Sequence, residues 1–121
     1  MANILIVDDS GMSRKKLKTI LENGSHTVVG EAQDGLEGIE QFKTLAPDLV
    51  TLDVTMPNMD GISCLESLLA IDEDARVVMI SALGKGDTML EALNLGAANY
   101  ITKPFEAEQV LNAISDALNM D

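Results

Sequence analysis

Five short apolar runs alternate with five amphipathic segments along this chain, and that alternation limits the possible folds more than any other feature. The apolar runs span residues 4–7, 27–29, 49–52, 77–80 and, more weakly, 99–101. Between and after them, apolar residues recur at helical spacing in five groups: Leu17, Ile20, Leu21; Leu36, Ile39, Phe42, Leu45; Ile62, Leu65, Leu68, Leu69; Met89, Ala92, Leu93; and Val110, Leu111, Ile114, Ala117, Leu118. Short apolar runs separated by helical segments are typical of βα units and predict an α/β fold.

The first four runs are nearly continuous in apolar or β-branched residues instead of alternating with polar ones. Strands of this kind are usually parallel and covered on both faces. Right-handed connections then place helices on both sides of the sheet, which predicts a doubly wound, five-stranded parallel sheet with five helices. Breaks at Asn23-Gly24, Ala46-Pro47 and Leu95-Gly96 agree, because glycine and proline belong at helix ends.

The length of 121 residues fits one compact domain, and we expect a single domain spanning 1–121. Cys64 is the only cysteine, so no disulfide can form within the chain, and a reducing compartment is expected. One cysteine and one histidine, His26, are too few for the usual zinc ligand sets.

The charge balance is strongly acidic, with 20 Asp and Glu residues against 8 Lys and Arg and a formal net charge of −12. This balance disfavours nucleic acid and anionic membrane surfaces, which are bound chiefly by clustered cations. The start of the chain has no basic segment, and its apolar run is too short for a signal peptide or a membrane anchor. We therefore expect a soluble cytoplasmic protein, with a monomer as the default.

Polar side chains follow four of the five predicted strands. They are Asp8 and Asp9, then Asp53, then Ser81, then Thr102 and Lys103, whereas the second run is followed only by Gly30, Glu31 and Ala32. In open α/β sheets, ligands bind beyond the carboxyl ends of the strands, so these positions are candidates for a site. Taken singly, most have ordinary explanations as helix N-caps, turn residues or surface charges. Asp53 is the hardest to explain in that way, because a proline-containing loop follows it.

Taken together, these polar residues indicate a functional site more specifically than any one of them alone. If the first and third strands are neighbours, Asp8, Asp9 and Asp53 converge, and their carboxylates repel one another unless a proton or a cation neutralises them. Oxygen ligands without histidine or cysteine favour Mg²⁺. An aspartate can also attack phosphorus and form an aspartyl phosphate, and that transfer needs cations and donors such as Lys103 and Ser81 beside it.

These residues stand in stretches that resemble the receiver domain of two-component response regulators. The matching stretches are 4–10 (Ile-Leu-Ile-Val-Asp-Asp-Ser), 52–61 (Leu-Asp-Val-Thr-Met-Pro-Asn-Met-Asp-Gly), 80–82 (Ile-Ser-Ala) and 96–105 (Gly-Ala-Ala-Asn-Tyr-Ile-Thr-Lys-Pro-Phe). The resemblance covers nearly the whole chain, and its nearest general likeness is to the stand-alone chemotaxis regulators related to CheY. It implies a flavodoxin-like receiver fold with strand order 2-1-3-4-5.

The resemblance also implies roles for the acidic residues. Asp53 corresponds to the phosphoacceptor. Asp8 and Asp9 look like the acidic pair that binds Mg²⁺ together with the acceptor, and the backbone carbonyl of Thr55 matches a further metal ligand.

The same resemblance assigns roles at the ends of the last two strands. Lys103 looks like the lysine that contacts the phosphoryl group, and its bond to Pro104 matches one that is commonly cis in the family. Ser81 resembles the hydroxyl residue that moves towards the phosphoryl oxygens. Tyr100 resembles the aromatic switch residue that turns inward with it.

Two positions depart from the well-known enteric chemotaxis regulators. Thr55 stands where they have asparagine, and Leu83 stands where they have an acidic residue. Both positions influence the rate of phosphoryl hydrolysis in this family, so the lifetime of the phosphoryl group is left open.

The resemblance predicts a signalling switch and not an enzyme that turns over an external substrate. A sensor histidine kinase would phosphorylate Asp53, and the surface of the fourth helix, fifth strand and fifth helix would change its affinity for a motor switch or chemotaxis protein. Because the sequence ends at Asp121, soon after the fifth predicted helix, we expect no output domain. An alternative is a phosphorelay intermediate that passes the group to a histidine phosphotransfer protein. A remote alternative is a flavodoxin-like cofactor binder or a small phosphohydrolase, although Asp8 and Asp9 would repel a phosphate in the absence of a metal.

Overall fold

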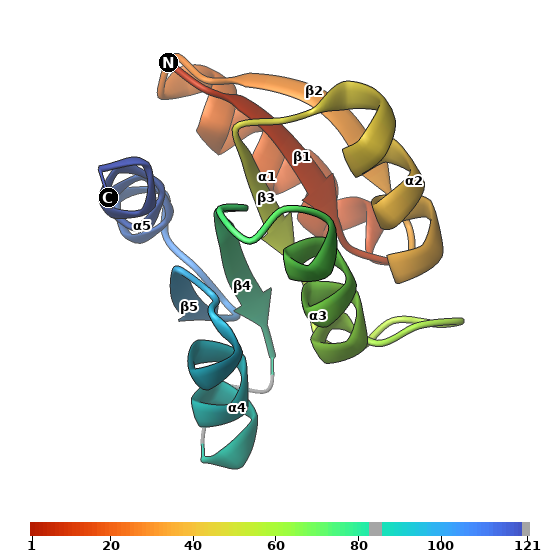
Figure 1. The fold of residues 1–121 in the computed structure, drawn as a ribbon. Coiled ribbons are helices and arrows are strands. Elements are labelled where there is room, and N and C mark those ends of the chain that lie inside the picture. Colours follow the sequence, from red (N-terminus) through yellow and green to blue (C-terminus); the bar gives the residue numbers. More distant parts are fainter. Residues whose placement is uncertain (83–85, 120–121) are drawn as a thin grey trace.

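The computed structural model describes residues 1–82 and 86–119, in which strands and helices alternate along the chain (Figure 1). The strands are β1 (Asn3–Val7), β2 (Thr27–Ala32), β3 (Leu49–Leu52), β4 (Val77–Ser81) and β5 (Asn99–Thr102). The helices are α1 (Gly11–Asn23), α2 (Gly35–Leu45), α3 (Gly61–Ile71), α4 (Asp87–Leu95) and α5 (Ala107–Leu118). Within the described residues, no helix is both long and apolar enough to cross a lipid bilayer.

The five strands form one parallel sheet in the order β2-β1-β3-β4-β5. β1 and β3 are hydrogen-bonded neighbours, with Ile4 opposite Leu49 and Val7 opposite Leu52. The predicted fold class and strand order are therefore confirmed. The order reverses direction at β1, which places the carboxyl ends of β1 and β3 side by side at the point where open α/β sheets bind ligands.

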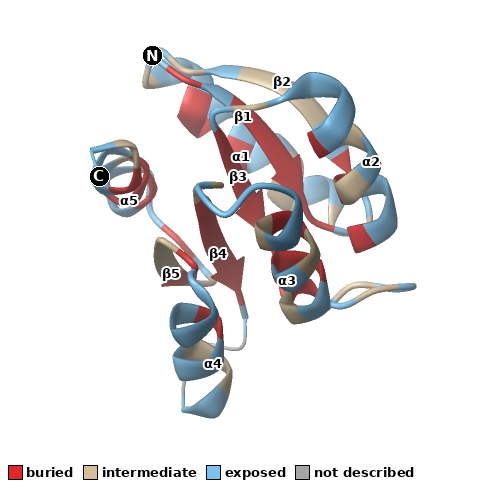
Figure 2. Ribbon diagram, in the orientation of Figure 1, coloured by how far each residue is buried: buried red, intermediate tan, exposed pale blue. Residues whose placement is uncertain are grey.

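Two apolar cores cover the two faces of the sheet (Figures 1 and 2). One core packs β-strand side chains against α1 and α5, and its largest fully buried members are Ile4, Ile6, Leu17, Leu21, Leu49, Ile80 and Ile114. The other core packs against α2, α3 and α4, and its largest fully buried members are Leu5, Leu52, Leu65, Leu68 and Met79. Because successive strand residues point to opposite faces, Ile4, Ile6 and then Asp8 share the α1 and α5 face.

Three helices begin in the same way, with an acceptor side chain followed by glycine. Ser10, Asp34 and Asp60 each accept a hydrogen bond from the backbone N–H three residues later and so cap α1, α2 and α3. The predicted helix ends are also confirmed. α2 stops at Ala46, which has a φ of 45°, and α4 stops at Gly96, which has a φ of 121°.

The second strand is longer than the sequence predicted. The apolar run stops at Val29, but β2 continues to Ala32, with a register shift opposite Ile4 and Leu5. Gly30 lies inside this strand because α2 packs tightly on it: a Cβ there would lie 2.4 Å from Gln41 Oε1. β2 is a half-exposed edge strand, so it accommodates Gly30 and Glu31. The apolar run in the sequence therefore ends before the strand does.

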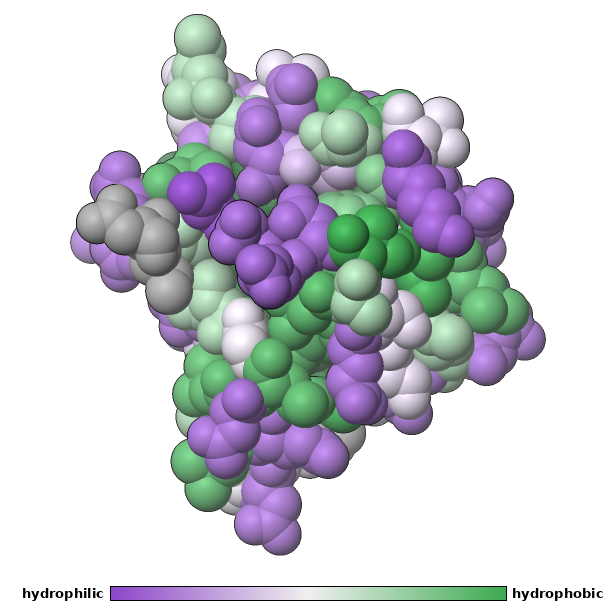
Figure 3. Space-filling view, in the orientation of Figure 1, coloured by the Kyte–Doolittle hydropathy of each residue, from purple (hydrophilic) through white to green (hydrophobic). Residues whose placement is uncertain are grey.

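Three leucines assigned to apolar helix faces are exposed. Leu36, in the first turn of α2, is 52% exposed, and Leu45, the last residue of α2, is 39% exposed. Leu93 of α4 is 40% exposed, together with Leu90 at 58%. Hydrophobic residues accordingly show among hydrophilic ones over α4, at the bottom of Figure 3. α4 is short and buries only Ala92 against the sheet, so its apolar stripe is wider than the surface available to cover it.

Candidate functional site

Asp8 follows the last residue of β1 and is held by contacts from several elements. Its backbone N–H donates to the carbonyl of Ala32 at 3.0 Å, and its Oδ1 accepts from the N–H of Ser10 at 2.8 Å. The Asp8 carboxylate is buried, whereas that of Asp9 is exposed. β1 thus presents one fixed carboxylate and one that faces solvent.

Asp53 follows the last residue of β3, directly beside the end of β1. Its N–H donates to the carbonyl of Val7 at 2.9 Å, which continues the pairing of the two strands past their ends. The Asp53 side chain is buried, and its Oδ1 accepts from the N–H of Val54 at 2.7 Å. Because Oδ1 is held in this way, Oδ2 faces the centre of the site.

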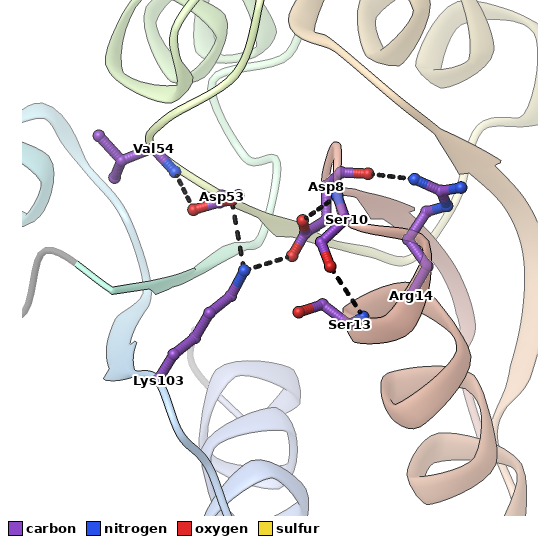
Figure 4. A network of polar contacts seen from close by, with 7 residues as sticks. All are labelled: Asp8, Ser10, Ser13, Arg14, Asp53, Val54 and Lys103. Carbon is purple, nitrogen blue, oxygen red and sulfur yellow. Dashed lines mark hydrogen bonds and ion pairs between the residues drawn. The ribbon is translucent and has the colours of Figure 1, made fainter.

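Lys103 follows β5 and reaches across the sheet to both carboxylates (Figure 4). Its Nζ lies 2.8 Å from Asp8 Oδ2 and 3.3 Å from Asp53 Oδ2. The bond from Lys103 to Pro104 is cis. Three strands that are far apart in sequence therefore converge on one small cluster of charges.

Burial and charge shift the pKa values of this cluster. The pKa of Asp53 is raised, first because burial disfavours the carboxylate and second because Asp8 lies close, while Lys103 and the Val54 N–H partly oppose both effects. Burial lowers the pKa of Lys103, but its hydrogen bond to Asp8 and the charges of Asp53 and Asp8 outweigh burial, so the net shift is upward. Lys103 therefore stays an ammonium ion, and a second cation would further favour ionised Asp53.

The carboxylates fit a hard divalent cation. Asp8, Asp9 and Asp53 each place one oxygen within 4.8 Å of the others. An all-oxygen set with one exposed carboxylate is the kind of partial cage in which Mg²⁺ keeps several waters. Thr55 is exposed in the loop that begins at Val54, and this loop is closed by a 2.7 Å hydrogen bond from the Gly61 N–H to the Val54 carbonyl.

Ser81 lies at the end of β4, and Tyr100 lies in β5. Ser81 is the last residue of its strand and is fully buried, so it is neither a turn residue nor a helix cap. Tyr100 is half-buried, and its side chain shares a hydrogen bond with Ser81. Burial raises the pKa of Tyr100, the hydrogen bond lowers it, and the charge of Asp53 raises it again, with a net upward shift. Leu83, the second position that departs from the enteric regulators, lies outside the described residues.

The sequence interpretation missed two groups that hold the site in place. Arg14 of α1 donates from Nη1 to the Asp8 carbonyl at 2.6 Å and pairs with Glu31 of β2 at 3.3 Å (Figure 4 shows the first contact). Asn58 of the loop after β3 donates to Asp34 at 2.7 Å. Neither residue directly follows a strand, so the pattern of polar residues at strand ends does not indicate them.

Comparison with known proteins agrees with this geometry. Residues 4–115 match the model of the response regulator receiver domain. The chain belongs to this family. The receiver domain described above is 46% identical over 116 residues to the chemotaxis protein CheY of Bacillus subtilis (strain 168), covering 96% of this chain and 97% of that protein. CheY of Treponema pallidum (strain Nichols) is 47% identical over 117 residues, which is 95% of this chain and 81% of that protein.

Solved structures give the same result for the receiver fold. The crystal structure of the CheX-CheY-BeF3-Mg complex from Borrelia burgdorferi matches with a TM-score of 0.94 at 40% identity, covering 98% of this chain and 90% of that chain. The response regulator domain of Thermotoga maritima CheB matches with a TM-score of 0.92 at 37% identity, covering 98% and 97%. The predicted family and receiver fold are thus confirmed by sequence and by structure.

Proposed function

We propose that this receiver domain is a phosphorylation switch in chemotaxis, in which Asp53 accepts a phosphoryl group in the presence of Mg²⁺. The observation that carries the proposal is the position of Lys103 Nζ, which contacts the carboxylates of Asp8 and Asp53 at the same time. A partly buried ammonium between two carboxylates supplies cationic charge where phosphoryl oxygens would collect. The similarity to CheY proteins supports the pathway.

In the proposed transfer, Oδ2 of Asp53 attacks the phosphorus atom of the donor. A new oxygen–phosphorus bond forms, and the bond from phosphorus to the donor's leaving atom breaks, with the electron pair going to the donor. A bound Mg²⁺ would neutralise charge on the phosphoryl oxygens, and Asp8, Asp9, Asp53 and the Thr55 carbonyl are the groups that would hold it. The Val54 N–H keeps Oδ1 fixed, so Oδ2 approaches phosphorus from one direction.

Charge balance explains why the transfer changes the protein. Three aspartates contribute three negative charges, which one divalent cation and Lys103 neutralise. After transfer, the single charge of Asp53 is replaced by a group of roughly −2 charge, so the site gains about one negative charge and three acceptor oxygens. Ser81 and Tyr100, already joined by a hydrogen bond, are the nearest proposed responders at the ends of the last two strands.

We infer the partners from the same chemistry. A sensor histidine kinase is the proposed donor, since a phosphoimidazole is a good leaving group for transfer to a carboxylate. The downstream partner would read the face made by α4, β5 and α5, where Tyr100 lies. The CheX-CheY complex of Borrelia burgdorferi is a precedent in a similar protein for partner binding. A cytoplasmic, monomeric switch without turnover of an external substrate fits this role.

The test uses acetyl phosphate as a small donor with MgCl₂. Intact-mass spectrometry of the wild-type protein should show one added phosphoryl group that hydroxylamine removes, and Asp53→Asn should show none. Asp116→Asn, which removes an exposed carboxylate of α5, is the matched control and should be labelled like the wild type. Labelling of Asp53→Asn, or no labelling of the wild type, would overturn the proposal. Hydrolysis of many phosphate esters per protein molecule would favour a phosphohydrolase instead.

A further inference from the structure

A hydrogen bond between two side chains joins the loop between β3 and α3 to the start of α2. Asn58 Nδ2 donates to Asp34 Oδ2 at 2.7 Å, across 24 positions of sequence. The other oxygen of the same carboxylate, Oδ1, accepts from the N–H of Glu37 at 2.8 Å and caps α2. One carboxylate therefore anchors the start of a helix and the tip of the loop at once.

The backbone at Asn58 is adapted to this tie. Asn58 has a φ of 67°, in the left-handed region that asparagine and glycine adopt more readily than other residues. The turn around it is tight, with a 2.7 Å hydrogen bond from the Met59 N–H to the Pro57 carbonyl. This conformation directs the Asn58 side chain to Asp34. Thr55 lies three residues earlier in the same loop.

Packing beside the hydrogen bond reinforces the tie. Met59 lies against Gly35, where a Cβ would come within 2.9 Å of the Met59 side chain, so the first residue of α2 and the loop are in close contact. At its other end the loop is closed by the Gly61 N–H and the Val54 carbonyl. Between these two fixed points, Thr55 is exposed, and its side chain makes no hydrogen bond within the part of the chain that the structure describes.

We propose that Asn58 is a positioning residue for the metal site, which holds the loop after Asp53 in the conformation that presents its backbone carbonyls to Mg²⁺. The inference rests on the proposed function, because it takes the Thr55 carbonyl as a ligand. Without the tie, the loop samples other conformations, and Mg²⁺ binding must order it first. Mg²⁺ affinity then falls, whereas the phosphorylation rate at saturating Mg²⁺ changes little, because the bound ion restores the order.

The main variant is Asn58→Gly, which is compatible with the left-handed backbone and removes the side chain that donates to Asp34. We expect its dissociation constant for Mg²⁺, measured by calorimetry on metal-free protein, to rise by about 3- to 10-fold. Ser25→Gly is the matched control, since Ser25 also has a positive φ, of 71°, but lies in the turn before β2. It should bind Mg²⁺ like the wild type. A merely structural role would lower the melting temperature and leave the dissociation constant of the folded protein unchanged.

Two further variants separate the tie from the helix cap. Asp34→Ser keeps a capping oxygen for α2 but is too short to reach Asn58, so it should weaken Mg²⁺ binding as much as Asn58→Gly, and the double variant should be no weaker than either. The exchanged pair Asp34→Asn with Asn58→Asp keeps the net charge, the cap and an amide-to-carboxylate hydrogen bond. It should bind Mg²⁺ within about 2-fold of the wild type.

The outcomes distinguish this inference from the proposed function. Equal Mg²⁺ affinity of the wild type and Asn58→Gly overturns the inference even if Asp53 is phosphorylated. Additive losses in the double variant also overturn it, because independent effects show that the two side chains do not act as a pair. Failure of the wild type to accept a phosphoryl group overturns the proposed function, while the calorimetric comparison still decides whether Asn58 positions the loop.

Discussion

Gly61 offers the sharpest test of how the acceptor strand is held. It is the first residue of α3, and a Cβ added there would lie 1.9 Å from the carbonyl oxygen of Asp53 and 2.7 Å from the Cα of Val54. Gly11 is the first residue of α1 and follows a similar capping residue, but a Cβ there would meet nothing closer than a nitrogen of Arg14 at 3.6 Å. The two glycines therefore occupy the same position in their helices, but only Gly61 has backbone atoms too close to admit a Cβ.

The expected magnitude follows from that difference. To bring the new methyl group of Gly61→Ala to 3.0 Å, the backbone around Asp53 must move by at least about 1.1 Å. Overpacking of this kind costs typically about 1–3 kcal/mol, and backbone atoms cannot rotate away as a side chain can. Gly11→Ala has no such conflict and should be stabilised by about 0.4–1 kcal/mol through loss of freedom in the unfolded chain. The two variants should therefore differ by about 1.4–4 kcal/mol.

Urea unfolding followed by far-UV circular dichroism measures this difference. We expect Gly61→Ala to unfold at a lower midpoint with an unchanged slope, and Gly11→Ala to unfold at or above the wild-type midpoint. The folded Gly61→Ala protein should also accept a phosphoryl group more slowly than Gly11→Ala, because the displaced atoms belong to the acceptor residue. Free energies of unfolding within about 0.5 kcal/mol of each other would refute the reasoning.

Three further predictions concern buried polar groups. Asp53→Asn should raise the free energy of unfolding at pH 7 without Mg²⁺. The folded-state pKa of Asp53 is raised, so the wild type loses stability as the pH rises through the unfolded-state pKa and then the folded-state pKa. A variant that is less stable than the wild type in thermal scans would contradict this. Thr51→Val should stabilise the protein by about 1 kcal/mol in urea titrations, since the buried Thr51 Oγ1 has no hydrogen-bond partner in the part of the chain that the structure describes. A loss of stability would show that Oγ1 does have a hydrogen-bond partner. Burial raises the pKa of Cys64 to about 12, so its thiol should not react with Ellman's reagent in the native state. The free energy of unfolding should fall between about pH 9 and 12 more steeply in the wild type than in Cys64→Ala. Equal dependence of the unfolding free energy on pH in the two proteins would rule out a buried neutral thiol.

The residues themselves show how far the sequence predicts this structure. Strands such as β3 were predicted because four consecutive buried residues leave an unambiguous apolar run. The convergence of Asp8 and Asp53 was predicted because neighbouring parallel strands end at one edge of the sheet. The position of Lys103 near the aspartates was predicted because it follows a strand that ends at the same edge. Its contact with both carboxylates was not predicted, since a long side chain leaves its contact partners open.

Other features depend on contacts that no local pattern records. Leu36 lies at helical spacing with buried residues, but α2 turns it away from the core at its first turn. His26 lies just before β2, and no sequence pattern indicates that it is half-buried or that its Nδ1 accepts from the Ala2 N–H at 3.2 Å. The pairing of Asn58 with Asp34 likewise requires two helix starts to meet at one edge, and this is known only once the chain is folded.

The proposed metal ligands are divided between interior and surface. Asp8 and Asp53 are buried in the continuation of the strands, so a substitution at either one also disturbs packing. Asp9 and Thr55 are exposed on the rim, where a change of side chain costs the fold little. Under the proposed function, a change of the Thr55 side chain leaves its carbonyl ligand in place, so the time for which the phosphoryl group is kept could change separately from the ability to gain it. The duration of a signal could then be adjusted at Thr55 while the buried pair, and the fold that carries it, stay the same.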